Sequence, residues 1–282
     1  FRRVLFRSQR SWVHKAMNPD SYRGPYAGQP DAGPAYARDV ARIIGELETK
    51  GKKPAAFICE TLLGVGGQMP LPDGYLEAVY AHVQKAGGVC IADEVQVGFG
   101  RVGSAFWGFE LQNVVPDMVV LGKPIGNGHP MGAVIVSRAI ADAFNNGLEY
   151  FNTFGGNPVS MATGMAVLGG VKEEGMQQQA LEVGEHLMDR LKTLMAQHPI
   201  IGDVRGRGLF IGVELVRDRQ TKEPAVPEID AIVEQMKDRG FLLSTDGPFH
   251  NVLKIKPPLP FSISDADDLC FHLNEVLAEG NF

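Results

Sequence analysis

The chain has few cysteines, no long apolar run and no excess of positive charge, and each of these absences argues against a class of protein. Only three of the 282 residues are cysteine, and none is spaced as C-x-x-C, so neither a disulfide framework nor a metal site is predicted. No run of about 18 apolar residues occurs, so no membrane-spanning helix is expected. The net charge of −6 argues against a nucleic-acid-binding protein. Apolar surroundings of the cysteines predict buried, reduced thiols and a cytoplasmic location.

The first residues do not resemble the rest of the chain. Residues 1–10 begin without methionine and place arginines among apolar residues, with no apolar core or cleavage site of a signal peptide. They resemble translated sequencing-adapter sequence, so we interpret residues 1–10 as a scar outside the fold and expect that a fragment begins here.

What the sequence does contain is the pattern of an α/β protein. Four short apolar runs predict strands buried on both faces of a mostly parallel sheet, at 55–59, 89–92, 118–121 and 133–136. Helical spacing of apolar residues predicts helices over 34–50, 72–85 and 176–197, and Asn157-Pro158 predicts the start of another over 158–174. Further strands (209–215, 241–244, 252–255) and helices (228–239, 265–279) follow. We therefore predict a large domain over 11–198 and a smaller α+β domain over 199–282.

A glycine motif offers one functional hypothesis. The stretch Gly98-Phe-Gly100-Arg-Val-Gly103 matches the G-x-G-x-x-G pattern of dinucleotide-binding turns. In such turns the first glycine follows the strand directly and the third opens a helix. Here five residues separate the strand from the motif, and a poor helix start follows it. A NAD-binding oxidoreductase is therefore a remote alternative, and we predict that these glycines shape a loop.

Chemically useful side chains instead follow three successive strands. Glu60, Asp93 and Lys123 stand at the carboxyl ends of these strands, where ligands of parallel sheets gather. Taken alone, they are also explained as an ion pair or as solvated strand ends. Pyridoxal phosphate (PLP), however, requires a lysine for its Schiff base and a carboxylate beside its pyridine nitrogen. Thr153 offers a hydroxyl for the cofactor phosphate, although a turn hydroxyl bonded to local backbone is an alternative.

Three ordered motifs carry a family resemblance. Ile91-Ala-Asp-Glu-Val-Gln-Val-Gly-Phe-Gly-Arg101, Gly122-Lys123 and Thr153-Phe-Gly-Gly-Asn-Pro158 resemble the class III aminotransferases, PLP enzymes of fold type I. The resemblance implies that Asp93 pairs with the pyridine nitrogen, and that Lys123 is both Schiff base and proton shuttle. It further implies that Val95 packs on the ring, Gln96 bonds the ring hydroxyl, and Thr153 reaches the neighbour's cofactor phosphate in a homodimer with a shared site. Glu60 supports the cofactor region by analogy, although a carboxylate bonded to backbone is equally consistent.

Within this family the chain is most similar to ethanolamine-phosphate and phosphohydroxylysine phospho-lyases. Ordinary transaminases usually have an arginine where Lys254 stands and often a glutamate where Val65 stands. An arginine fork matches a carboxylate, whereas a lysine point charge serves a phosphate. We therefore favour phospho-lyase activity on a phosphorylated primary amine, with Lys254 at the substrate. Transamination remains the alternative, Lys254 is equally explained as a solvated lysine, and an inert relative is a remote possibility.

The resemblance also implies a missing part. The upstream third of such enzymes supplies a glycine–serine turn for the cofactor phosphate and an aromatic residue for the ring, and the recognisable match starts at Ser11. We therefore expect an N-terminally truncated chain that binds PLP weakly or not at all alone.

Overall fold

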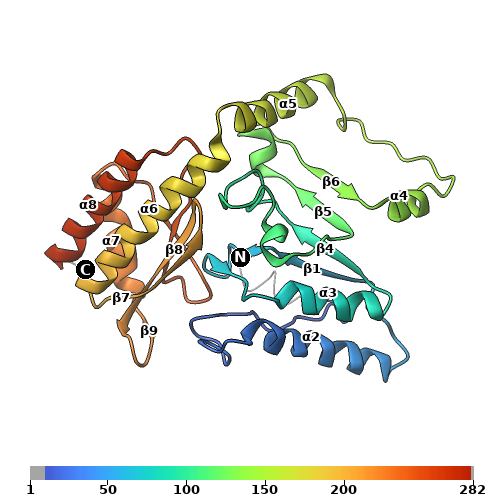
Figure 1. The fold of residues 1–282 in the computed structure, drawn as a ribbon, viewed down its shortest axis with the longest axis horizontal. Coiled ribbons are helices and arrows are strands. Elements are labelled where there is room, and N and C mark those ends of the chain that lie inside the picture. The colour runs from blue at the N-terminus through green and yellow to red at the C-terminus, as the bar shows by residue number, and fades with distance from the viewer. Residues whose placement is uncertain (1–9, 281–282) are drawn as a thin grey trace.

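The computed structural model describes residues 10–280, which form two α/β units side by side, bridged by the long helix α6 (Met176–Gln197; Figure 1). The first unit holds α2 to α5, and the second holds α7, α8 and the strands from β7 onward. Apart from Arg10, the segment interpreted as a scar lies outside the described residues.

The sheet of the first unit is mostly parallel, as predicted. Its strands are ordered β1 (Ala56–Glu60), β4 (Val89–Asp93), β5 (Met118–Leu121) and β6 (Ala133–Val136). The first three run parallel and β6 is antiparallel to β5. A two-stranded ladder of β2 (Leu62–Leu63) and β3 (Met69–Pro70) follows β1. The carboxyl ends of β1, β4 and β5 therefore lie at one edge.

One face of this sheet is covered by α2 (Ala32–Glu48) and α3 (Tyr75–Lys85) (Figure 1). Both helices carry apolar residues at helical spacing, and these residues form a common core with Cys90 of β4. On the edge strands, however, Ile58 is 61% exposed and Val134 also 61% exposed. The prediction of strands buried on both faces is wrong for β1 and β6, because they are sheet edges and both helices pack on the same side.

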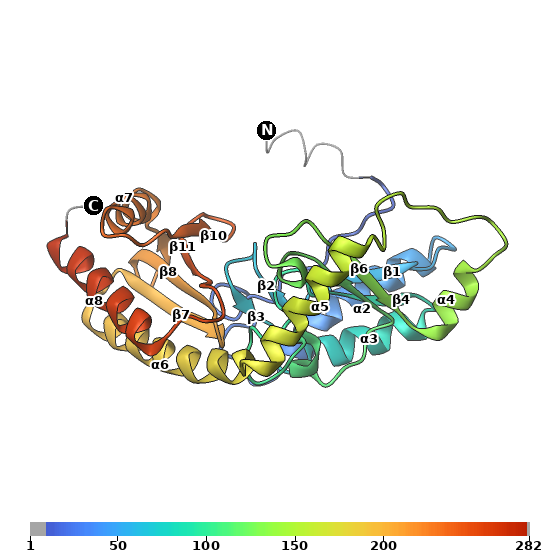
Figure 2. The same cartoon turned by 90° about the horizontal axis from the view of Figure 1, so that it is seen from above.

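The second unit is antiparallel. Its strands are ordered β10 (Ser244–Asp246), β11 (Val252–Ile255), β8 (Phe210–Asp218) and β7 (Ile201–Arg207), and β9 (Glu223–Pro224) pairs with β8. Apolar faces of α6, α7 (Val226–Asp238) and α8 (Ile263–Glu279) form one core with these strands (Figure 2). Ser262 caps α8 by accepting a hydrogen bond of 3.1 Å from the Asp265 amide.

The glycine motif packs against α6. A Cβ on Gly100 would lie 2.9 Å from Gln177 Cβ, and one on Gly103 would lie 2.5 Å from Leu181 Cα. Both glycines also have φ of +76°. The next helical element is the 3₁₀ helix η1 (Gly108–Gln112), and no helix opens at Gly103 in the described chain. The motif therefore lacks the helix N-terminus of a dinucleotide turn. Because α6 contacts both units, the division at 198/199 stays a proposal.

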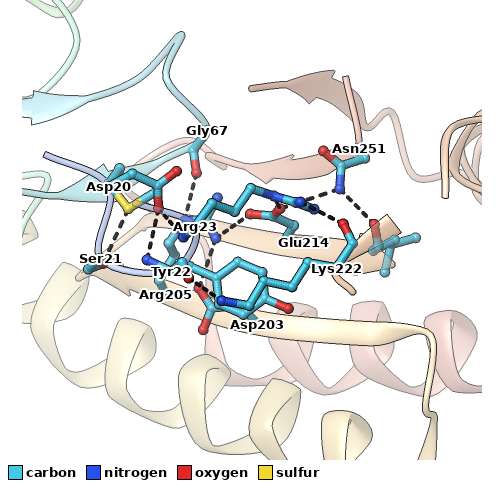
Figure 3. Close-up of polar contacts among 12 residues, drawn as sticks. Asp20, Ser21, Tyr22, Arg23, Gly67, Asp203, Arg205, Glu214, Lys222 and Asn251 are labelled. Carbon is cyan, nitrogen blue, oxygen red and sulfur yellow. Dashed lines mark hydrogen bonds and ion pairs between the residues drawn. The ribbon is translucent and has the colours of Figure 1, made fainter. Parts of the chain in front are cut away.

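A buried charge network fastens the segment around residue 23 to the second sheet (Figure 3). The Glu214 carboxylate on β8 accepts from the Arg23 Nε atom and, at 2.7 Å, from the Arg205 guanidinium. Arg23 also donates to the Lys222 carbonyl, and the Lys222 ammonium donates to the Tyr22 carbonyl at 2.6 Å. The network joins residues far apart in sequence.

In the first unit, two helices flank an exposed loop. Helix α4 (Arg138–Phe144) precedes it, and α5 (Pro158–Glu173) follows, capped by Asn157, which accepts from the Ser160 amide at 3.0 Å. In the described part of the chain, no helix has the length and apolarity needed to cross a membrane.

Candidate active site

The strand ends bring the predicted residues to one edge of the first sheet. Glu60 and Asp93 are direct partners in the register of β1 and β4, and Lys123 begins η2 (Lys123–Gly126), two residues after β5. The Asp93 carboxylate accepts a 3.0 Å hydrogen bond from the Val95 amide, which fixes the turn after β4. The Val95 side chain lies beside Gly122, 3.2 Å from where a Cβ would stand. Glycine at position 122 therefore leaves room for Val95 next to Lys123.

Lys123 itself has an unusual backbone. Its φ of +38° lies in the left-handed region, which side chains rarely adopt. Within residues 10–280, no hydrogen bond or ion pair holds its ammonium group. Strained backbone at a non-glycine residue is characteristic of functional sites, where the surrounding fold maintains it.

Glu94, the acidic residue that directly follows Asp93, has a structural role. It is buried and accepts from the Thr61 hydroxyl at 2.8 Å, the Gly108 amide at 3.0 Å and the Phe109 amide at 2.9 Å. Burial raises the pKa of Glu94, and these hydrogen bonds oppose that rise. Asp93, the last residue of β4, makes none of these contacts and bonds the Val95 amide instead.

A cavity of about 530 Å³ opens beside Lys123. Its charged lining groups are Arg101, Lys123 and Lys256, and no carboxylate of residues 10–280 lines it. Val95, Gln96, His129 and the loop around Gly128 complete much of the wall. The His129 ring bonds the Ser160 hydroxyl at 2.8 Å, which ties this loop to α5. A cavity of this size with only positive charges suits an anionic ligand.

Glu60, Gln96 and Lys256 form a polar chain at the cavity wall. Glu60 accepts from the Gly64 amide at 2.9 Å and lies 3.5 Å from the Gln96 amide nitrogen. Burial raises the pKa of Glu60, and the negative charge of Asp93 adds to this. The Lys256 ammonium donates to the Gln96 amide oxygen and lies 4.8 Å from the Phe210 ring centroid. Gln96, expected at the cofactor ring, is thus held from both sides.

Lys256 was missed by the sequence reasoning. Burial, together with the positive charges of Lys254, Arg101 and Lys123, lowers the pKa of Lys256 to about 7. A signal was present in the sequence, because Lys254 and Lys256 are two residues apart and side chains two apart on a strand share a face.

Lys254, the predicted substrate residue, has a carboxylate partner. Its ammonium lies 2.8 Å from the Asp246 carboxylate, which also accepts from the Gln68 amide at 2.9 Å. Lys254 is not among the residues that line the cavity. Thr153 does not line it either and lies exposed in the loop before α5. Of the predicted residues, Val95, Gln96 and Lys123 therefore line the cavity, and Glu60 and Asp93 lie at the adjoining strand ends. Lys254 lies outside the lining and is paired with Asp246.

The cysteines have ordinary roles. Burial raises the pKa of Cys59 and of Cys90 to about 12 and that of Cys270 to about 11, which disfavours the nucleophilic thiolate. Among the described residues, no three histidine, cysteine or acidic side chains gather as metal ligands.

Comparison with known proteins identifies the family. Residues 4–277 match the family described as aminotransferase class-III. The chain belongs to this family. A Drosophila melanogaster protein named alanine--glyoxylate aminotransferase 2-like is 49% identical over 272 residues, covering 94% of this chain and 55% of the relative. Ethanolamine-phosphate phospho-lyase homolog 1 of Caenorhabditis elegans is 41% identical over 283 residues, covering 96% and 61%.

Solved structures of a phospholyase and of transaminases share the fold. A phospholyase from Arthrobacter in complex with phosphoethanolamine has a TM-score of 0.89 and 39% identity, covering 94% of this chain and 63% of that one. These neighbours are PLP-dependent enzymes of fold type I, and one, an amine transaminase from a Pseudomonas species, is in the PLP-bound form. The chain spans 55% to 61% of the length of the two curated relatives. Two further relatives are named as mitochondrial, so the cytoplasmic location stays a prediction.

The residues present fit the cofactor of class III aminotransferases. The cavity offers the lysine amine of Lys123, which has no hydrogen-bond or ion-pair partner among the described residues, and further cations, while the Asp93 carboxylate stands at the end of the neighbouring strand outside the lining. An anionic aldehyde with a basic ring nitrogen is the kind of ligand that such a donor set accepts.

Proposed function

We propose that the enzyme to which this chain belongs is a PLP-dependent phospho-lyase that eliminates phosphate from ethanolamine phosphate or a related phosphorylated amine. The observation that carries the proposal is the cationic cavity wall beyond Lys123, where Lys256 stands directly after β11 and Arg101 stands beside it in the lining. Lysine binds phosphate as a point charge, whereas carboxylate recognition favours the bidentate fork of arginine. The names of the Caenorhabditis and Arthrobacter relatives support the same reading.

Each residue of the site would have a separate task. PLP, when bound, supplies an aldehyde that captures the substrate amine and a ring that withdraws electrons. Asp93 would hold the ring nitrogen, Val95 would pack on the ring, and Gln96 would bond the ring hydroxyl. Lys123 would carry the cofactor at rest and then remove a proton from the carbon beside the substrate amine. Phosphate would leave from the next carbon, and water would release acetaldehyde and ammonia from ethanolamine phosphate.

Transamination is the second candidate. It is favoured by the name of the Drosophila relative, an alanine–glyoxylate aminotransferase-like protein. In that case a carboxylate substrate would need an arginine, and Arg101 is the one that lines the cavity. The Arg101 guanidinium already donates to the Leu209 and Pro257 carbonyls, at 3.2 and 2.8 Å, through one nitrogen. Its other nitrogens would have to hold the substrate.

The two activities are separated by one pair of assays on an extended protein, in which the upstream segment of a relative is joined to this chain and PLP is supplied. We expect phosphate release from ethanolamine phosphate at least about 100-fold above the rate without enzyme, as positioned acid–base catalysis alone provides. Amino transfer from alanine to glyoxylate should be slower in the same preparation. Efficient transamination without phosphate release would refute the lyase proposal, and Lys123→Ala is the inactive control for both assays.

We also propose that the enzyme is a homodimer with a shared site, in which Thr153 reaches the partner's cofactor phosphate. The loop that carries Thr153 is rich in exposed apolar side chains, with Phe151 78% and Phe154 80% exposed. Exposed apolar groups this concentrated are typical of association surfaces.

For the dimer, we expect the mass of two chains in sedimentation equilibrium and a shift toward one chain for Phe154→Asp, since a charge at the centre of an interface is costly. Val115→Asp, at another exposed apolar residue outside this loop, is the matched control. A wild-type protein that stays monomeric at high concentration would contradict the proposal.

A further inference from the structure

Besides Lys123, the cavity contains two cations, Arg101 and Lys256, that no carboxylate of the described residues neutralises. Lys256 contacts the neutral amide of Gln96 and the face of Phe210, and no carboxylate within the described residues lies at ion-pair distance. Arg101 donates to two carbonyl oxygens and has no carboxylate partner in the part of the chain that the structure describes, and burial lowers its pKa to about 10. Buried cations are normally paired, because removal from water disfavours the charged form. Both groups face a space large enough for a ligand.

Lys254 differs from Lys256 although the two are close in sequence, Lys254 within β11 and Lys256 directly after it. Its charge is compensated by Asp246 at 2.8 Å, and Gln68 holds Asp246 in place. Ser244 of β10 is the register partner of Lys254, so the ion pair joins neighbouring strands diagonally. A lysine with its own carboxylate has less charge to offer a ligand than one without.

We propose that Lys256, together with Arg101, forms the subsite for the anionic group of the substrate, a phosphate monoester, and that Lys254 acts indirectly by holding β10 against β11. This assignment deepens the proposed function and rests on it for the identity of the anion.

The geometry supports a subsite next to the cofactor residues. The Lys256 ammonium has three donors and uses one on Gln96, so two remain for phosphate oxygens. Gln96 is the residue expected at the cofactor ring, and Lys256 and Lys123 line the same cavity as Gln96. Glu60 on β1 is the carboxylate whose charge acts most on Lys256, while Lys254, Arg101 and Lys123 oppose its protonation. An incoming phosphate would offset these three positive charges.

Lys256 and Lys254 provide a variant and its matched control for a direct experiment on the 282-residue chain. Binding of inorganic phosphate and of phosphoethanolamine is measured by calorimetry at pH 6, with Lys256→Met, Lys256→Arg and Lys254→Met. We expect Lys256→Met to weaken binding by about 10- to 100-fold, which is the loss of one hydrogen bond to a charged group. Lys256→Arg should recover most of the affinity, and Lys254→Met should change it by less than about threefold.

Thermal unfolding gives a second readout. Lys256→Met removes a desolvated charge and should raise the unfolding temperature, whereas Lys254→Met leaves Asp246 without its cation and should lower it. If Lys256 had only a structural role, Lys256→Met would lower the unfolding temperature and leave the phosphate affinity unchanged. That result, or a larger affinity loss for Lys254→Met than for Lys256→Met, would overturn the assignment, as would the absence of phosphate binding to the wild-type chain.

The phosphate could come from the cofactor instead of the substrate, and a loaded protein distinguishes the two. PLP is fixed on Lys123 of the extended protein by borohydride, and phosphoethanolamine binding is measured again. Binding that persists and still depends on Lys256 supports a substrate subsite, and binding abolished by the fixed cofactor assigns Lys256 to the cofactor phosphate and overturns the proposal. An extended protein that binds phosphoethanolamine through Lys256 but releases no phosphate would refute only the proposed function.

Discussion

Lys123→Ala is expected to abolish covalent attachment of PLP and to reduce turnover of the extended protein at least about 100-fold, the contribution of one positioned acid–base group. Lys123 is the amine that the β5 end presents to the cavity without a hydrogen-bonding partner in the described structure. The left-handed backbone of Lys123, with φ of +38°, turns the chain away from the direction of β5, and the surrounding turn maintains this conformation. An alanine there would keep the cavity but remove both the point of attachment and the proton carrier.

The attachment is measured by borohydride reduction, digestion and mass spectrometry of the peptide that contains Lys123. An absorbance band at about 420 nm, expected for the lysine-bound cofactor, should disappear in the same variant. Lys256→Met is the control, because this second amine of the cavity should leave attachment at Lys123 intact. Retention of the band in Lys123→Ala, or reduction of PLP onto Lys256 in the wild type, would show that Lys123 is not the attachment residue.

The strength of this band also tests the sequence-based expectation of weak binding. Lys123 and Gln96 line the cavity and Asp93 ends the neighbouring strand, while the family resemblance predicts that an upstream turn and an aromatic residue complete the cofactor site. We therefore expect a faint band for the chain alone and a strong one for the extended protein.

The sequence was sufficient where burial follows a local period. Strands β5 and β11 and helix α6 have the predicted bounds, because short apolar runs mark the two strands and the apolar residues of α6 recur every third or fourth position. Strand β7 was missed because it reads Ile-Gly-Asp-Val-Arg-Gly-Arg, with two glycines and three charges. Arg205 within it is nevertheless buried, since Glu214 and Asp203 neutralise it. Such a strand is stabilised by tertiary ion pairs that no local pattern contains.

The candidate site shows the same limit. Glu60, Asp93 and Lys123 were found because strand ends of a parallel sheet converge, a rule that needs only the order of strands. The distinction between Lys254 and Lys256 depends on the register of β10 with β11, which brings Asp246 to one lysine and not the other. Strand β10 was predicted at 241–244 and lies at Ser244–Asp246, so Asp246 had no predicted place.

Glu214→Ala should be the most destabilising of the substitutions considered, with a loss of about 3–5 kcal/mol in the free energy of unfolding. Its carboxylate is buried and binds both Arg23 and Arg205, as Figure 3 shows. Without it, two guanidinium groups would remain in a largely dry environment, and Asp203 would be the carboxylate still paired with Arg205, at 2.8 Å. Urea unfolding followed by circular dichroism measures the loss.

The control for Glu214 is an exposed pair on the same sheet. Glu223 lies 2.9 Å from Arg217, with side chains 55% and 45% exposed. Glu223→Ala should therefore cost less than about 1 kcal/mol, because water screens this pair. Equal losses for the two variants would contradict the role assigned to the buried network.

A local readout separates loss of the network from a general weakening of the fold. The Arg23 side chain is one of few links between the segment around residue 23 and the second sheet, through Glu214 and the Lys222 carbonyl. In Glu214→Ala, trypsin should cut after Arg23 well before the core of the second unit unfolds, since protease access follows the local opening of a segment. Arg205 also donates to the Gly67 carbonyl at 2.9 Å, and the neighbouring Gln68 holds Asp246 in place. Glu214→Ala should therefore also loosen the ion pair between Lys254 and Asp246. In Glu214→Ala, the free energy of phosphate binding should change less than the free energy of unfolding, since Lys256 and Arg101 do not contact the network.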